Sequence, residues 1–204
     1  MHRTRSIDVL LNAAEEELEK IREFYGESAV SRNPSDRLLV AIKTYCEHLR
    51  SALDYVAHDI QQRCCPGAKP KAHVYFPIAK TPSDFDSAVR AWCPGLKSTC
   101  PQVWSQLESV QPYKGNENEW LETFRQLTNE VKHRDLVAHE YREEPVREGI
   151  PDGLGPVVFR VSAEEQGRPY DSWVEFLLRD SGKNSLLFLG GCRTDIWLLI
   201  DELL

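Results

Sequence analysis

A chain of 204 residues, with 41% apolar and 28% charged side chains, is long enough for one domain with a real hydrophobic core and has an ordinary globular composition. Its net charge of −7 argues against a broad basic surface that coats nucleic acid, but it leaves room for local contact with RNA. No apolar run approaches the roughly 20 residues that span a bilayer, and the basic start leads into an acidic helix. We therefore expect a cytoplasmic protein without membrane contact.

Helical periodicity dominates the first two thirds of the chain. Five helices are expected, over residues 7–25, 36–63, 83–92, 100–110 and 118–142. Ser35 stands where the second helix needs an N-cap, and Pro82 stands in the first turn of the third. The apolar, proline-interrupted segment 74–78 is expected to be an extended loop packed on the helices.

The composition changes after residue 144. Residues 145–156 contain three prolines and three glycines, which is typical of a linker. Three strands of a small antiparallel sheet are expected after it, over residues 157–161, 173–178 and 186–189, with a hairpin turn at 180–183. A last helix is expected over 195–204, capped by Thr194. The predicted fold class is α+β, with a helical bundle over 1–144 and a sheet plus terminal helix over 145–204, packed on the bundle as one unit because so small a sheet is weak alone.

The six cysteines do not form metal-type pairs, because no Cys-x-x-Cys occurs and Cys64 and Cys65 are adjacent. Without a secretory signal, we interpret them as reduced thiols, mostly buried. A zinc site built from Cys93, Cys100 and a histidine is the alternative, although the usual ligand spacing is absent. The main interpretation includes no metal and no cofactor.

The most informative segment is Lys132-His133-Arg134-Asp135-Leu136-Val137-Ala138-His139. The guanidinium of Arg134 stays charged and matches the geometry of a phosphate, and the imidazole of His139 titrates near neutral pH. Asp135 precedes His139 by four residues and could orient it, and Lys132 could bind backbone phosphate. Such a cation beside a proton acceptor can cleave RNA without a metal.

Arg134, four intervening residues and His139 resemble the ribonuclease motif of the HEPN superfamily, in which an arginine precedes a histidine by a short spacing on a helical bundle. The resemblance implies a metal-independent endoribonuclease of the toxin or phage-defence type, a hydrolase that binds RNA, transfer RNA included. It implies that His139 is the general base on a ribose 2′-hydroxyl, that Arg134 steadies the charge on phosphate, and that cleavage leaves a 2′,3′-cyclic phosphate. It also implies a homodimer and an antitoxin or defence-system partner.

The spacing of the motif constrains how it can work. Five residues turn an ideal helix by about 140°, so Arg134 and His139 do not share one helix face. They can cooperate only if the helix loosens between them or if a second chain completes the site, as it does in the HEPN superfamily.

A second resemblance covers residues 10–140. The order Leu49-Arg50-Ser51-Ala52-Leu53-Asp54, Phe76-Pro77-Ile78, Gln111-Pro112-Tyr113 and Asn129 to Lys132-His133-Arg134 is similar to the layout of a group of uncharacterised bacterial proteins. That layout implies the fold but no settled activity. Those relatives usually carry Asp before Lys-His-Arg, where this chain has Val131.

Other interpretations stay open. Arg134 could pair with Asp54 or Glu47 on another helix, which favours a non-catalytic HEPN-scaffold module for interaction or oligomerisation. A small-molecule or metal binder would need a pocket lined by His48, His58 or the cysteines. The polar stripe Glu47, Arg50, Asp54 and His58 fits either a metal or an ordinary polar face, and Trp92, Trp104 and Trp120 fit either base stacking or the core.

Overall fold

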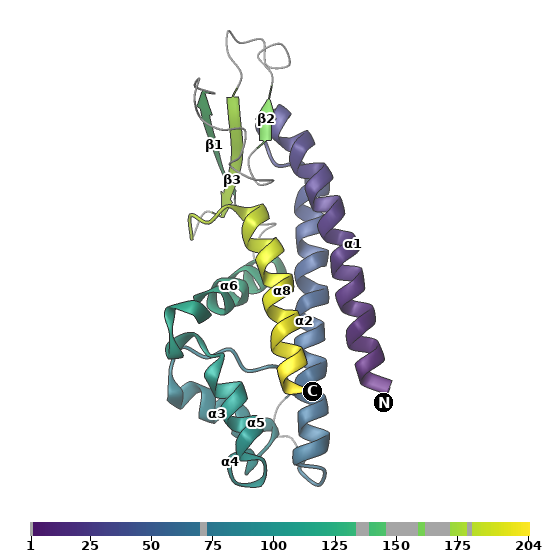
Figure 1. Ribbon diagram of the computed structural model, residues 1–204, viewed down its shortest axis with the longest axis vertical. Coiled ribbons are helices and arrows are strands. Elements are labelled where there is room, and N and C mark those ends of the chain that lie inside the picture. The colour runs from purple at the N-terminus through teal and green to yellow at the C-terminus, as the bar shows by residue number, and fades with distance from the viewer. Residues whose placement is uncertain (1, 70–72, 134–138, 146–158, 162–171, 179–180) are drawn as a thin grey trace.

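The computed structural model describes residues 2–69, 73–133, 139–145, 159–161, 172–178 and 181–204. The fold is α+β, as the sequence predicts: helices dominate, and one small antiparallel sheet accompanies them (Figure 1). The helices are α1 (His2–Ser31), α2 (Asp36–Cys64), α3 (Pro82–Trp92), α4 (Leu96–Thr99), α5 (Pro101–Ser109), η1 (Pro112–Lys114), η2 (Asn116–Asn118), α6 (Glu119–His133) and α8 (Ser185–Leu203). The strands are β1 (His139–Pro145), β2 (Phe159–Val161) and β3 (Ser172–Leu178).

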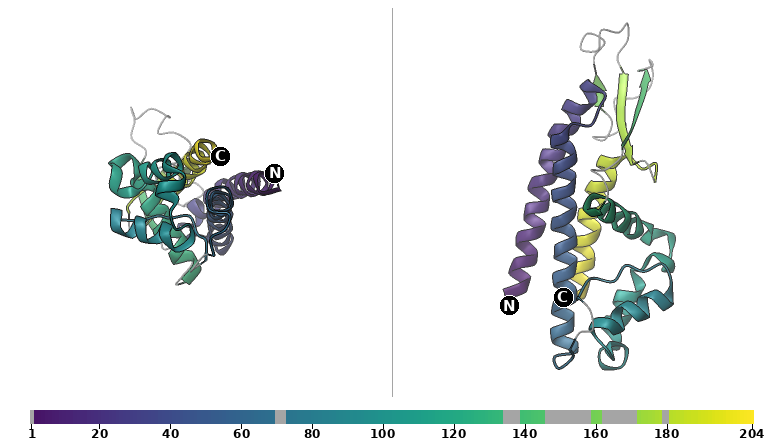
Figure 2. Two further views of the ribbon diagram at one scale, coloured as in Figure 1. Left: turned by 90° about the horizontal axis from the view of Figure 1, so that it is seen from below. Right: turned by 180° about the vertical axis from the view of Figure 1, so that it is seen from behind.

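Helix α2 is the central element of the molecule. It runs antiparallel to α1, and α8 and α6 pack against it as well (Figures 1 and 2). The buried apolar residues of these helices and of strand β3 form one continuous cluster, so the described elements share a single core. Among the described helices, none combines the length and the apolar character needed to cross a lipid bilayer.

The turn between α1 and α2 is fixed by two serines. The hydroxyl of Ser35 accepts a hydrogen bond from the Leu38 N–H at 3.2 Å, which confirms the predicted N-cap. The Ser28 hydroxyl accepts from the Ser35 N–H at 3.0 Å and donates to the Ser35 hydroxyl at 3.2 Å. The end of α1 is thereby tied to the start of α2.

The sheet lies at one end of the α1–α2 hairpin, with strand order β1-β3-β2 and both pairings antiparallel (Figure 1). Val174 and Phe176 of β3 are buried in the core. Tyr25 of α1 accepts a hydrogen bond from the Phe176 N–H at 2.6 Å, and the Ser185 hydroxyl donates to the Phe176 carbonyl at 3.0 Å. The sheet is therefore packed on the helices, as expected.

The predicted helix over 118–142 is wrong at its C-terminal end, over residues 139–142. Helix α6 ends at His133, and residues 139–145 form strand β1, in register with β3 from His139–Leu178 to Pro145–Ser172. Tyr141 packs on Phe176 with ring centroids 5.8 Å apart. The stabilisation gained by pairing along the whole strand outweighs the local helical preference that the spacing of apolar residues indicates. The division expected at 144/145 thus falls inside β1, and the sheet draws on both sides of it.

The strand predicted over 186–189 is also wrong. These residues begin α8, whose N-cap is Asn184 rather than Thr194, with the Asn184 side chain accepting from the Leu187 N–H at 3.0 Å. A short apolar run does not distinguish a strand from a buried helix, which explains the error. Gly182, with φ of 64°, belongs to the connection from β3 to α8 and not to a hairpin.

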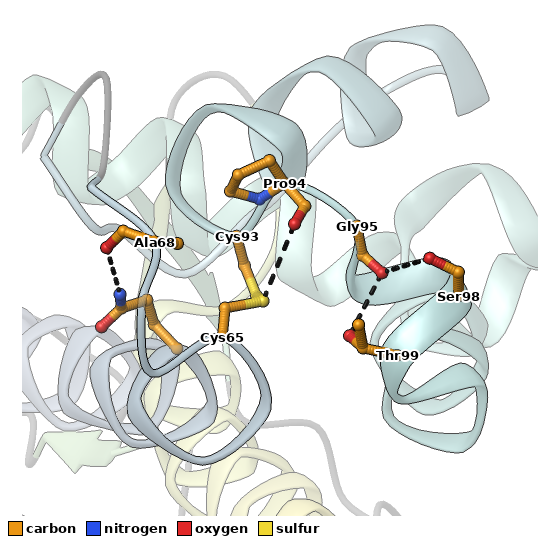
Figure 3. Close-up of a disulfide and its surroundings, with 8 residues drawn as sticks. Cys65, Ala68, Cys93, Pro94, Gly95, Ser98 and Thr99 are labelled. Atoms are coloured by element: carbon orange, nitrogen blue, oxygen red, sulfur yellow. Dashed lines mark hydrogen bonds between the residues drawn. A yellow bond between two sulfur atoms is a disulfide. The ribbon is translucent and has the colours of Figure 1, made fainter.

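A disulfide joins Cys65, just after α2, to Cys93, just after α3 (Figure 3). The expectation that all six cysteines are reduced thiols is therefore wrong for this pair. Cys93 is also unavailable to the zinc site considered above, and the described residues contain no group of three His, Cys, Asp or Glu side chains that could hold a metal. Cys46 and Cys192 are buried free thiols, and Cys64 and Cys100 are half-buried ones.

Replacing both Cys65 and Cys93 with Ala should lower the free energy of unfolding by about 3 kcal/mol, because the bridge spans 28 residues and restricts the unfolded chain. Urea unfolding without reductant measures the loss, with Cys100→Ala as the control for removal of a free thiol. Reductant should lower the unfolding midpoint of the parent and leave that of the double variant unchanged. A parent protein indifferent to reductant would contradict the bridge.

Candidate functional site

An extended segment, residues 74–79, is held against α2 by one arginine–aspartate pair. The Asp54 carboxylate accepts a hydrogen bond from the Phe76 N–H at 2.8 Å, and the Arg50 guanidinium donates to the Phe76 carbonyl at 3.0 Å. Arg50 and Asp54 lie four residues apart on one face of α2, and the Arg50 Nη2 is 3.1 Å from the Asp54 Oδ1. Both backbone groups of Phe76 are thereby satisfied without a neighbouring strand.

Gln111 holds the same segment from the other side. Its side chain is fully buried; the amide nitrogen donates to the Pro77 carbonyl at 3.0 Å and to the Leu107 carbonyl at 2.8 Å, and the amide oxygen accepts from the Ala79 N–H at 2.9 Å. The residues of the layout noted in the sequence therefore meet in space, because Arg50, Asp54 and Gln111 all fix the segment that contains Phe76 and Pro77.

A pocket of about 430 Å³ opens beside this segment, between α2, α3 and α6. Phe76, 1% exposed, and Trp92, 2% exposed, are buried lining residues, whereas Tyr75 and Asn129 are exposed and form part of the rim. Such a volume lies within the range of small-molecule sites. The pocket is thus a candidate binding site.

The polar side of the pocket carries two guanidinium groups from different helices, Arg50 of α2 and Arg125 of α6. Arg125 donates two hydrogen bonds of 2.7 Å to Glu122, which also pairs with Lys80 at 3.0 Å. Partial burial alone raises the pKa of Glu122, but hydrogen bonds from Arg125, Lys80 and Gln126 outweigh it and lower that pKa to about 2. Glu122 therefore stays ionised and holds Arg125 in place.

Asp54 is the carboxylate that lines the pocket. Burial raises the pKa of Asp54, and the charge of Arg50 and the hydrogen bond from Phe76 oppose that rise. Each guanidinium of the pocket is therefore held by a carboxylate, Arg50 by Asp54 and Arg125 by Glu122.

The residues predicted as catalytic are only partly described. Arg134 and Asp135 lie outside the described residues. Lys132 belongs to the last turn of α6, and His139 opens strand β1 opposite Leu178. Because α6 ends at His133 and His139 is in a strand, the two ends of the motif are not on one continuous helix, so the rotation of about 140° calculated for an ideal helix does not apply.

The inter-helix partners considered for Arg134 each have an ion pair within α2. Asp54 pairs with Arg50, and Glu47 pairs with Lys43 at 2.7 Å. Trp92 and Trp104 are buried, and Trp120 is partly buried against the core. Of these tryptophans, Trp92 lines the pocket.

His73, Tyr75, Arg125 and Thr128 line the pocket but were not singled out in the sequence. A signal was present on α6, because positions 125, 128 and 129 follow the spacing that places residues on one helix face, and position 132 continues it. His73 and Tyr75 carry no such signal, since they belong to an irregular segment.

Comparison of the chain with protein-family models, with curated proteins and with solved structures finds no match.

Glu122→Gln should destabilise the protein at neutral pH, because the neutral amide loses the charged pairing with Arg125 and Lys80. The folded-state pKa of about 2 lies below the ordinary value of 4.5, so this stabilisation is complete above about pH 4.5 and is lost as the pH falls towards 2. Urea unfolding from pH 6 to pH 2.5 should therefore show a difference between parent and variant that shrinks with acid. Glu119→Gln, an exposed change in the first turn of α6, is the control; a constant difference for Glu122→Gln would refute the pairing.

Proposed function

We propose that this protein is a metal-independent endoribonuclease that cleaves RNA through a 2′,3′-cyclic phosphate, with Arg134 and His139 as its catalytic residues. The observation that carries the proposal is the position of the pocket relative to the motif. Arg125, Thr128 and Asn129 of α6 line the pocket, and Lys132 and His133, which begin the motif segment, follow in the last turn of the same helix. Asn129 precedes His133 by one turn, about 6 Å of helix rise. RNA bound at the pocket would thus lie close to the start of the motif.

The proposed reaction is an internal phosphoryl transfer. His139 takes the proton of a ribose 2′-hydroxyl, and the resulting oxygen attacks the adjacent phosphorus. The bond from phosphorus to the 5′-oxygen of the next nucleotide breaks, and that oxygen receives a proton from water. Arg134 stabilises the charge on the phosphate oxygens, Asp135 orients His139, and Lys132 binds a flanking phosphate.

A non-catalytic interaction module on the same scaffold is the second candidate. One observation favours it: Arg50, Asp54 and Gln111, which belong to the layout noted in the sequence, bind backbone groups of segment 74–79 and so serve the architecture. The same layout is compatible with a scaffold kept for its fold alone.

Arg134→Ala and His139→Ala should each reduce cleavage of single-stranded or transfer RNA in EDTA by at least about a hundredfold, the usual contribution of a general base or a charge-stabilising group. Cyclic phosphate ends on the products, detected by their resistance to phosphatase, check the mechanism. Low ionic strength is required because the net charge of −7 weakens contact with RNA.

Arg5→Ala and His48→Ala remove the same two residue types away from the motif and are the matched controls. The variants must also keep the circular dichroism spectrum of the parent. Activity that disappears in EDTA and returns with a metal would refute the mechanism, and equal activity in all variants would refute the site. Inactivity of the parent under every condition would favour the interaction module.

We expect a homodimer of two-fold symmetry, the commonest closed assembly, with the ends of the two α6 helices facing each other. Its interface should bury about 1,000 Å² or more in total. Light scattering at micromolar concentration checks the mass, and mixing inactive Arg134→Ala with inactive His139→Ala checks whether two chains share a site. Recovered activity in the mixture would support a shared site, whereas a strict monomer would refute the assembly.

A further inference from the structure

We infer that the pocket between α2, α3 and α6 is a nucleotide-binding site, with its apolar wall taking the base and its two arginines taking the phosphate. The inference concerns binding, and it does not require the cleavage chemistry proposed above. It rests on the residues that line the pocket and on their free hydrogen-bonding groups.

The apolar wall is aromatic and has free space beside it. Phe76 and Trp92 are its buried aromatic residues, and the small side chains of Ala88 and Ala91, one turn apart on α3, leave room next to them. Phe76 and Trp92 form the buried base of this wall, and the exposed rings of Tyr75 and His73 beside it offer a planar ligand a stacking surface, which every nucleobase can use.

The polar side has unused donors suited to an anion. Arg50 uses its Nη2 for Asp54 and the Phe76 carbonyl, and Arg125 uses its Nε and Nη2 for Glu122. The Nη1 group of each arginine therefore has no partner among the described residues. Two guanidinium groups from different helices, each with free N–H groups, match the several oxygens of a phosphate.

The rim supplies groups that can discriminate between bases. The Asn129 side chain is exposed, and an amide offers a donor and an acceptor side by side, which is the pairing that reads base edges. The rings of His73 and Tyr75 lie 5.9 Å apart, at the same opening, and Tyr75 is 51% exposed. A base with a phosphate fits this combination of aromatic wall, paired arginines and polar rim.

A nucleotide can reach the pocket free in solution or as one unit of an RNA chain, and calorimetric titration of the whole protein distinguishes the two. The probes are the four nucleoside 5′-monophosphates, the corresponding nucleosides, inorganic phosphate and a single-stranded hexaribonucleotide with a non-cleavable 2′-O-methyl backbone. We expect at least one monophosphate to bind, and to bind about tenfold or more tightly than its nucleoside, because charge-assisted hydrogen bonds to the phosphate are lost in the nucleoside. A hexamer that binds more tightly than any monophosphate identifies RNA as the source, and the reverse order identifies a free nucleotide; both support the site.

Two variants locate the binding. Ala88→Phe fills the space beside the aromatic wall and should weaken the binding of the monophosphate by about tenfold or more. Ser87→Phe places the same side chain on the exposed neighbour outside the pocket and should change the affinity less than about twofold. Arg125→Gln should weaken the monophosphate by about tenfold and leave the nucleoside unchanged, which keeps the test valid if Ala88→Phe does not fold.

Three results would overturn the inference. One is that no monophosphate and no hexamer binds. Another is that inorganic phosphate binds as tightly as every monophosphate, since the aromatic wall then contributes nothing. The third is that Ala88→Phe and Arg125→Gln, shown to be folded by circular dichroism, bind as the parent does.

Discussion

The pocket depends on how the backbone of Phe76 is satisfied. An extended segment packed on helices has no neighbouring strand, and a buried peptide group without a partner is costly. Arg50 and Asp54 meet both the N–H and the carbonyl of Phe76, and Gln111 does the same for the residues that follow. Segment 74–79 can therefore stay at the mouth of the pocket without being part of a sheet, which leaves its side chains free to line the pocket.

The second constraint is the central position of α2. Helices α1, α6 and α8 all contact it, and Tyr45 in its middle donates a hydrogen bond to the Leu189 carbonyl of α8. Burial raises the pKa of Tyr45 far above its ordinary range, so the hydroxyl remains a neutral donor. Tyr25 of α1 connects that helix to the sheet in a similar way, because its hydroxyl accepts a hydrogen bond from the Phe176 N–H of β3. Polar anchors inside an apolar core thereby fix how the helices and the sheet meet.

Helices α2 and α3 were predictable because local chemistry marks their starts, whereas α4 was not predicted and α1 runs six residues beyond its predicted end at residue 25. Ser35 and Thr81 cap α2 and α3, and the apolar spacing between such caps is unambiguous. The end of α6 and the start of α8 were not predictable, because Tyr141 and Phe176 must find each other across the sheet before residues 139–145 favour a strand. The disulfide was missed for the same reason, since Cys65 and Cys93 become neighbours only after α2 and α3 pack.

The candidate site likewise combines features that the local sequence marks with features that depend on tertiary packing. The sequence pointed to Arg50, Asp54, Phe76 and Asn129 through their layout, but their convergence on one pocket follows from tertiary packing. The motif from Lys132 to His139 was visible as chemistry. The geometry of that motif depends on the residue at which α6 ends. The apolar periodicity of the sequence predicted a helix end at residue 142, whereas α6 ends at His133.

The position of the disulfide has a consequence for the pocket. Cys93 directly follows Trp92, so the bridge to Cys65 anchors the aromatic wall of the pocket to the end of α2 (Figure 3). Covalent closure at this point removes freedom that a ligand would otherwise have to restrict on binding. If the bridge raises the affinity of a ligand by some factor, thermodynamic linkage requires that the bound ligand shift the reduction equilibrium of the bridge towards the disulfide by the same factor. Thiol redox state and pocket occupancy are then two measurements of one coupling free energy.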